Sequence, residues 1–188
     1  TCTIKDYKSL VERFGQRMRI INSYGVTEAS VDSGYYEEAL DRIPEIANTP
    51  IGKPLDNTAF YILDPSLNPQ PVGVYGELYI GGEGIARGYL NKPELTKERF
   101  VPNRFAAGGK MYKTGDLARW LPDGNVEFLG RIDHQVKIRG FRIETGEIET
   151  KLLENQNISE AVVIDREDKK GHKYLCAYIV ARAKTNAN

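Results

Sequence analysis

The fold is decided by residues 60–65, FYILDP, together with residues 77–82, ELYIGG. In both stretches a run of aromatic and branched apolar residues stops at residues that favour turns. Similar runs occur at Asn125–Leu129 and Val136–Ile138. Because short apolar runs alternate with turns over the whole range 58–143, we expect a mainly antiparallel β structure with a barrel-like form.

Helical patterns flank this β-rich part. Thr3 and Asp6 have the spacing of a capping box, and apolar residues at helical spacing follow as far as Gly15. A strand over 18–22 and a short helix near 35–40 are expected next.

After Arg131 the pattern changes again, which predicts a boundary between a unit of residues 1–132 and a smaller unit of residues 133–188. The smaller unit begins with a short hairpin through Gly140 and continues with a helix. Two strands complete it, at 161–165 and 174–181. The predicted fold class is therefore α+β, a mainly antiparallel, barrel-like portion followed by the start of a small α/β unit.

The composition excludes several classes of protein. Lys and Arg number 26 and are balanced by 26 Asp and Glu, so no overall field attracts nucleic acid or an anionic membrane surface. No stretch approaches the roughly 18 apolar residues of a membrane-spanning helix. The cysteines, Cys2 and Cys176, fit neither a disulfide framework nor a zinc site, which favours a reducing, cytoplasmic setting.

Single motifs leave the chemistry open. Gly82, Gly84 and Gly88 miss the dinucleotide-binding spacing, because the third glycine comes one place late and no amphipathic helix follows at once. Asp116 follows Gly115 in a turn that could present a carboxylate to vicinal hydroxyls, although a lone Thr-Gly-Asp is more often an ordinary turn.

Charged residues other than Asp116 are equally ambiguous when taken one at a time. Four basic residues lie close together in the sequence: Arg131, Lys137, Arg139 and Arg142. They suit phosphate recognition, or they form a solvated strand face. His134 and His172 have no partner at catalytic or metal-binding spacing, so we expect both to be structural or surface residues.

Four motifs read together narrow the choice. They are NSYGVTE (22–28), GELYIGGEGIARGY (76–89), YKTGD (112–116) and GRIDHQVKIRGFRIE (130–144). In order and spacing they resemble the adenylate-forming superfamily, and most closely the adenylation domains of nonribosomal peptide synthetases. Val26 stands where that family usually has Pro, and Thr145 where it usually has Leu, which leaves the charged positions intact.

The resemblance implies a ligase that joins an amino-acid carboxylate to the α-phosphate of ATP. In-line placement and charge neutralisation are what such a reaction needs from the protein. By this resemblance Tyr24 stacks on adenine, Thr27 contacts phosphate and Glu28 helps to hold Mg²⁺. Asp116 binds both ribose hydroxyls, and Arg131 contacts ribose or phosphate.

The family then transfers the aminoacyl group to a phosphopantetheine thiol on a peptidyl carrier protein. By resemblance Asp133 is the hinge for the smaller unit, and Gly140 lines the pantetheine tunnel. Lys137 is counted with Thr27, Glu28 and Arg131 as a catalytic contact.

The resemblance also assigns a substrate pocket, to Ser23, Val31 and Asp32. A carboxylate at the end of a pocket needs a cation on the ligand. The combination of Ser, Val and Asp resembles domains that activate ornithine or lysine, so we expect a basic amino acid, ornithine ahead of lysine. Alternatively, Asp32 points to solvent or pairs with a cation of the protein.

Several family features have no counterpart in this sequence: the phosphate loop with its lysine, the aspartate for the substrate amino group and the catalytic lysine near the family's C-terminus. We therefore expect an excised C-terminal piece of an adenylation domain, inactive without the missing N-terminal part. Two alternatives stay open. One is another adenylate former, such as a D-alanine carrier-protein ligase or an acyl-CoA synthetase, and the other is a noncatalytic docking module.

Overall fold

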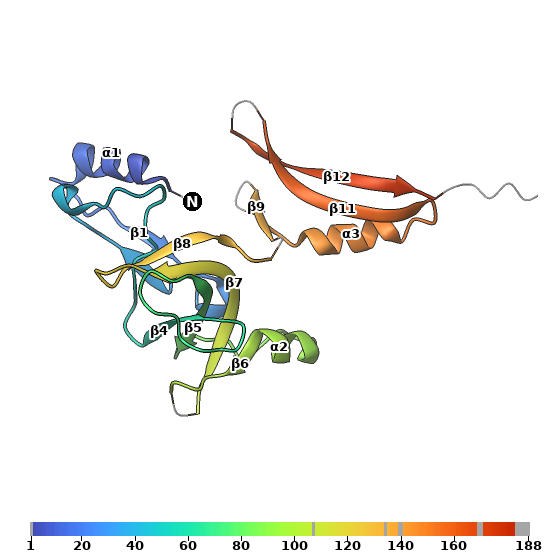
Figure 1. Cartoon of the computed structure of the whole chain (residues 1–188), viewed down its shortest axis with the longest axis horizontal. Helices are drawn as coiled ribbons and strands as arrows, with labels where there is room; N and C mark the ends of the chain where they lie inside the picture. Colours follow the sequence, from blue (N-terminus) through green and yellow to red (C-terminus); the bar gives the residue numbers. More distant parts are fainter. Residues whose placement is uncertain (1, 107, 134, 139–140, 169–170, 183–188) are drawn as a thin grey trace, which may run out of the picture. The chain divides into compact units, whose positions relative to one another are not determined.

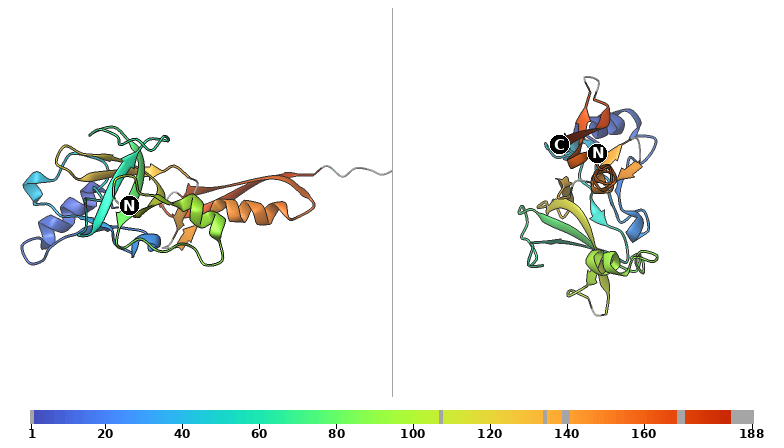
Figure 2. Two further views of the ribbon diagram at one scale, coloured as in Figure 1. Left: turned by 90° about the horizontal axis from the view of Figure 1, so that it is seen from below. Right: turned by 90° about the vertical axis from the view of Figure 1, so that its right-hand side faces the viewer.

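The structure is a computed structural model of the chain (Figures 1 and 2), and it describes residues 2–106, 108–133, 135–138, 141–168 and 171–182. The chain divides into two units, Thr1–Ile132 and Asp133–Asn188, and each is described by itself. Within the described ranges, no helix is long and apolar enough to cross a membrane.

An antiparallel sheet of five strands is the centre of the first unit, with the order β4-β5-β7-β6 and with β8 also paired to β7. The strands are β4 (Thr58–Leu63), β5 (Gly76–Gly82), β6 (Phe100–Pro102), β7 (Lys110–Trp120) and β8 (Val126–Arg131). β7 is long and curved (Figure 1), and its pairing register shifts once against β5 and once against β8. This curled sheet confirms the predicted antiparallel, barrel-like fold.

The main core lies on one face of this sheet. Its fully buried members come from four strands: Ile62, Leu78, Ile80, Ala118 and Val126. Ile62 belongs to the predicted run at 60–65, and Leu78 and Ile80 belong to the run at 77–82. Burying such side chains is worth about 1.5–3 kcal/mol each, so the two runs stabilise the sheet that carries the site.

A second, three-stranded sheet joins the N-terminal helix to this core. Helix α1 (Ile4–Phe14) begins at Thr3, whose Oγ1 accepts a hydrogen bond from Asp6 N at 3.1 Å, as the capping pattern predicts. The sheet has the order β1-β2-β3, with bounds Asn22–Tyr24, Gly34–Tyr36 and Lys53–Pro54. Tyr7 of α1 packs against Tyr36 of β2, with ring centroids 5.3 Å apart.

Two expectations for this part were wrong. The helix expected near 35–40 is replaced by β2 and by the short 3₁₀ helix η2 (Leu40–Arg42). The reason is the period of burial, because Gly34 and Tyr36 are buried while Tyr35 between them is exposed. The strand expected at 18–22 begins only at Asn22, and α2 (Pro93–Arg99) was not predicted.

The second unit follows the predicted order. Its elements are β9 (Val136–Ile138), β10 (Phe141–Ile143), α3 (Thr145–Leu153), β11 (Ile158–Glu167) and β12 (Lys173–Ala181). β9 pairs with β10, and β11 pairs with β12, both antiparallel. Helix α3 packs along β11 (Figure 2), where Glu149 Oε1 accepts a hydrogen bond from Val163 N at 2.7 Å.

The two packed tyrosines of the first unit predict opposite effects of the same substitution. Among the described residues, Tyr36 Oη is the single buried side-chain polar atom without a hydrogen-bond partner. Tyr36→Phe should therefore raise the free energy of unfolding by about 1 kcal/mol, because an unsatisfied polar group is removed. Urea denaturation of the protein measures this change.

Tyr7→Phe is the matched control for this prediction. Tyr7 Oη donates to Ile20 O at 2.8 Å and accepts from Glu38 N at 3.1 Å, so its loss should cost about 1–3 kcal/mol. If the two variants were destabilised equally, the assignment of Tyr36 as unsatisfied would be wrong.

Candidate functional site

The centre of the site is the carboxylate of Asp116, which lies on β7 and is only 4% exposed. Its Oδ1 accepts a hydrogen bond from Arg131 Nη1 at 2.9 Å, and its Oδ2 accepts one from Tyr24 Oη. Asp116 lies on β7, Arg131 ends β8 and Tyr24 ends β1. The structure thus brings together three of the residues that the sequence predicted for one nucleotide site.

The backbone that presents Asp116 leaves the regular β ladder. Gly115 has a positive φ of 76°, a conformation that glycine adopts easily. Thr114 Oγ1 donates to Leu78 O at 2.6 Å and accepts from Asp116 N at 3.0 Å. Gly115 O accepts from Ile132 N at 2.8 Å. Three backbone groups at this irregular pairing, Leu78 O, Asp116 N and Gly115 O, therefore have partners.

Glu77 supplies a further support for the same turn, and sequence reasoning missed it. Its Oε1 accepts a hydrogen bond from Gly115 N at 3.0 Å, while Lys113 Nζ lies 3.8 Å from its Oε2. Burial raises the pKa of Glu77, and the charge of Lys113 partly opposes that shift. A carboxylate within an apolar strand pattern was the available signal, because such a group is rarely buried unless it has a partner.

Tyr24 acts as a hydrogen-bond donor to Asp116. Burial raises the pKa of Tyr24 well above its usual value, and the neighbouring carboxylate of Asp116 raises it further, so the hydroxyl stays protonated. The ring of Tyr24 packs edge-on against Phe60, with centroids 6.1 Å apart. Tyr24 is thus fixed by the contact of its ring with Phe60 of the core and by the hydrogen bond of its hydroxyl to Asp116.

A second cluster surrounds Glu28, in the 3₁₀ helix η1 (Thr27–Ala29) directly after β1. The side chain of Glu28 is buried, and its Oε1 accepts a hydrogen bond from Tyr89 Oη at 2.6 Å. Tyr89 Oη lies 3.2 Å from Tyr112 Oη. Thr27, beside Glu28, is exposed. Sequence reasoning did not find Tyr89, which is 61 residues away in the chain.

The three residues assigned to a substrate pocket are all exposed within this chain. Val31 has a positive φ of 74°, and Asp32 N donates to Ser30 O at 3.0 Å, which makes a γ-turn that is strained for a β-branched residue. The ion pairs of the described residues include none with Asp32. The alternative of a pairing with a protein cation therefore finds no support within the described ranges.

The residues predicted for the second unit are only partly described. Asp133 Oδ1 accepts a hydrogen bond from Gln135 N at 3.2 Å, and Lys137 lies on β9 in register with Arg142 of β10. Gly140 lies outside the described residues, as do Arg139 and His134.

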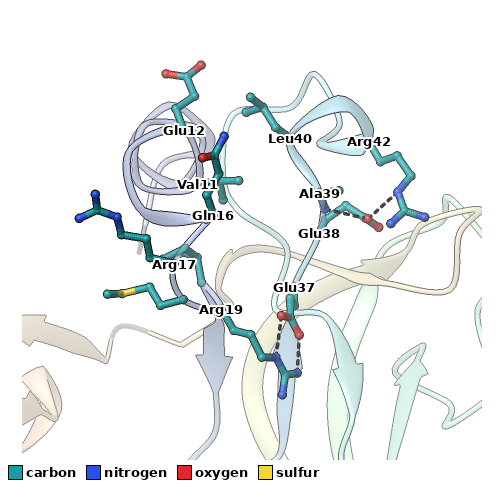
Figure 3. A pocket seen from close by; sticks show the side chains of 13 residues that line it. Val11, Glu12, Gln16, Arg17, Arg19, Glu37, Glu38, Ala39, Leu40 and Arg42 are labelled. Atoms are coloured by element: carbon teal, nitrogen blue, oxygen red, sulfur yellow. Dashed lines mark hydrogen bonds and ion pairs between the residues drawn. The ribbon is translucent and has the colours of Figure 1, made fainter.

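A cavity of about 820 Å³ lies elsewhere in the first unit, between the end of α1 and the segment from Glu37 to Arg42 (Figure 3). Arg19 and Glu37, two of the residues that line it, form a two-pronged ion pair, with Arg19 Nε 2.8 Å from Glu37 Oε1. None of the predicted site residues lines this cavity.

Comparison with known proteins agrees with this geometry. Residues 2–90 match the family described as AMP-binding enzyme. The chain is 98% identical to bacitracin synthase 2 of Bacillus licheniformis over all 188 residues, and 60% identical to gramicidin S synthase 2 of Brevibacillus brevis over 186 residues. It spans only 7% and 4% of the length of these two relatives.

The solved structures that resemble this chain include adenylation domains. One is PA1221, a nonribosomal peptide synthetase protein that contains adenylation and PCP domains. It is 29% identical to this chain with a TM-score of 0.79, and the match covers 98% of this chain and 37% of PA1221. The Vibrio cholerae adenylation domain AlmE, solved with glycyl-adenosine-5′-phosphate, is 28% identical with a TM-score of 0.77, covering 92% of this chain and 34% of that one. The chain belongs to the AMP-binding, adenylate-forming enzymes, and within them to the adenylation domains of nonribosomal peptide synthetases.

The turn that presents Asp116 yields a prediction on stability. Thr114→Val keeps the shape of the side chain but leaves Leu78 O and Asp116 N without their bonds to the hydroxyl, so we expect a loss of about 1–3 kcal/mol by urea denaturation. Thr58→Val on β4 is the control. Within the described residues the Thr58 hydroxyl makes no hydrogen bond, so its loss should cost under about 0.5 kcal/mol. Equal effects of the two substitutions would argue against a supporting role for Thr114.

Proposed function

We propose that the enzyme containing this chain activates an amino acid as its adenylate and loads it onto a carrier protein. The observation that carries the proposal is the buried Asp116 carboxylate, oriented by Arg131 and Tyr24 at the end of a curled sheet. Carboxylates bind vicinal ribose hydroxyls elsewhere in nucleotide sites. The names of the relatives support the same class of reaction, because they are synthases of bacitracin and gramicidin S.

In the proposed reaction a carboxylate oxygen of the amino acid attacks the α-phosphorus of ATP. The bond between the α-phosphorus and the bridging oxygen breaks, and pyrophosphate leaves with its electron pair. Asp116 would hold the ribose, Tyr24 the adenine and Thr27 a phosphate, and Arg131 would contact the ribose or a phosphate. These residues place the reactants in line and neutralise charge, so no protein nucleophile is required.

Mg²⁺ would neutralise charge on the phosphates of ATP when bound. The described residues hold no group of three or more His, Cys, Asp or Glu side chains suited to a metal ion. A metal that arrives on nucleotide phosphates needs only one or two protein carboxylates, so Glu28 fits this role. Glu28 is buried, and a hydroxyl fixes one of its oxygens.

In the second half of the proposed reaction, a phosphopantetheine thiol of a peptidyl carrier protein takes the aminoacyl group and releases AMP. We assign Asp133 as the hinge about which the smaller unit rotates between the two half-reactions. Gly140 would line the pantetheine tunnel, and Lys137 would make a catalytic contact. The support is the motif that spans residues 130–144. PA1221, which carries adenylation and PCP domains together, is consistent with a carrier-protein partner.

For the substrate we propose a basic amino acid, ornithine ahead of lysine. Asp32 makes no ion pair within the described residues, and a carboxylate that closes a pocket needs a cation from the ligand. Ser23 leaves room for a long side chain, and Val31 would pack against its methylene groups.

The role of Asp116 is tested in the complete adenylation domain by amino-acid-dependent exchange of pyrophosphate with ATP. Asp116→Asn should lower kcat/KM for ATP by about 100-fold, since two hydrogen bonds to a charged group are worth about 1.5 kcal/mol or more each. Asp41→Asn, in exposed η2, should behave as the wild type. The 188-residue chain alone, which spans only part of the solved relatives, should give no exchange above background. Full exchange activity in Asp116→Asn would overturn the assignment.

The substrate proposal is tested in the same assay with ornithine and with norleucine, which replaces the side-chain ammonium by a methyl group. Asp32→Ala should lower kcat/KM for ornithine by about 30-fold or more, because removing one partner of a buried charge pair costs about 2–5 kcal/mol. The same variant should change kcat/KM for norleucine little. A wild-type preference for leucine or phenylalanine over ornithine would contradict the proposal.

A further inference from the structure

The hydroxyl of Tyr89 is committed to Glu28. The two oxygens lie 2.6 Å apart, within the range of a strong hydrogen bond to a carboxylate. A phenol hydroxyl donates and a carboxylate oxygen accepts, so Tyr89 is the donor in this bond. With that proton directed to Glu28, the Tyr89 oxygen is left to accept a hydrogen bond from Tyr112 at 3.2 Å.

Tyr89 is itself held in place from several sides. Its backbone N–H donates to Thr96 Oγ1 of α2 at 2.8 Å, and its ring packs edge-on against Phe100, with centroids 5.4 Å apart. Gly88 before it has a positive φ of 145°, and a Cβ there would lie 2.3 Å from the Thr96 side chain. A side chain at position 88 would therefore displace the segment that carries Tyr89.

The backbone ties the same segment to the helix that holds Glu28. Ala86 N donates to Glu28 O at 2.9 Å, and Ser30 Oγ donates to Gly84 O at 2.8 Å. The segment 84–89 therefore contacts η1 through both main chain and side chain. Because this segment is fixed against η1, the Tyr89 hydroxyl that it carries restricts the orientation of the Glu28 carboxylate.

We propose that Tyr89 is a positioning residue that orients Glu28 toward the metal ion carried by the nucleotide. This inference rests on the proposed function, in which Glu28 helps to hold Mg²⁺. Groups that hydrogen-bond to metal-ligating carboxylates typically contribute about 10–100-fold to metal affinity. Tyr89 would not touch the metal or the nucleotide itself.

The test uses the complete adenylation domain and the unreactive nucleotide α,β-methylene-ATP. Its affinity is measured by titration calorimetry with and without Mn²⁺, which separates the metal-dependent gain in affinity from the binding of the nucleotide alone. Tyr89→Phe should reduce the metal-dependent gain by about tenfold and leave the metal-free affinity unchanged. Tyr61→Phe is the matched control, because Tyr61 Oη accepts from Asn103 Nδ2 at 3.2 Å away from Glu28, and it should keep the full gain.

Two further variants distinguish the possible failures. If Glu28→Gln keeps the full metal-dependent gain, the metal role of Glu28 in the proposed function is wrong. If Glu28→Gln loses the gain and Tyr89→Phe keeps it, the positioning role alone is wrong. Equal losses of metal-free and metal-dependent affinity in Tyr89→Phe would show a merely structural role.

Should Tyr89→Phe fail to fold, Tyr112→Phe provides the test. It removes the donor to the Tyr89 oxygen and leaves the bond from Tyr89 to Glu28 in place. A smaller loss of the metal-dependent gain, about two- to threefold, is expected. An unchanged gain would overturn the proposal.

Discussion

The site depends on one interruption of the β ladder, at residues 114–116 of β7. A strand that bends away from its partner leaves backbone groups without ladder bonds, and buried groups of this kind must find other partners. Here Thr114 and Glu77 bind the N–H groups of Asp116 and Gly115, and Ile132 N binds Gly115 O. These three backbone groups therefore have partners, and the Asp116 carboxylate beside them accepts hydrogen bonds from Arg131 and Tyr24.

The second constraint is the close approach of three segments around Glu28. The chain turns sharply after β1, and a Cβ on Gly25 would lie 1.8 Å from Val31 O, so only glycine fits there. The strained turn at Val31 follows, and such strain persists where surrounding contacts determine the backbone. Contacts from 84–89 reach the same helix, so the metal-binding candidate and the assigned substrate pocket share one scaffold.

Much of this structure could be predicted because it is local. The runs at 60–65 and 77–82 predicted strands from their local pattern alone. The assignment of Tyr24, Asp116 and Arg131 to one site came instead from the resemblance to a known family, which the four ordered motifs carry. The prediction of a helix near 35–40 was wrong, because a strand of three residues is too short for its alternating pattern to be recognised in the sequence. Tyr89 and Glu77 escaped notice since their partners lie 61 and 38 residues away, and pairings over such separations leave no trace in local spacing.

The central claim is that the interruption in β7 presents Asp116 to the ribose hydroxyls of ATP. The most direct measurement compares the affinities of ATP and 2′,3′-dideoxy-ATP for the complete adenylation domain and for its Asp116→Asn variant. The wild type should bind ATP at least about tenfold more tightly than the dideoxy nucleotide, because hydrogen bonds to a charged group are worth about 1.5–3 kcal/mol each. The variant should lose most of this preference. Equal binding of the two nucleotides by the wild type, or an undiminished preference in the variant, would contradict the account.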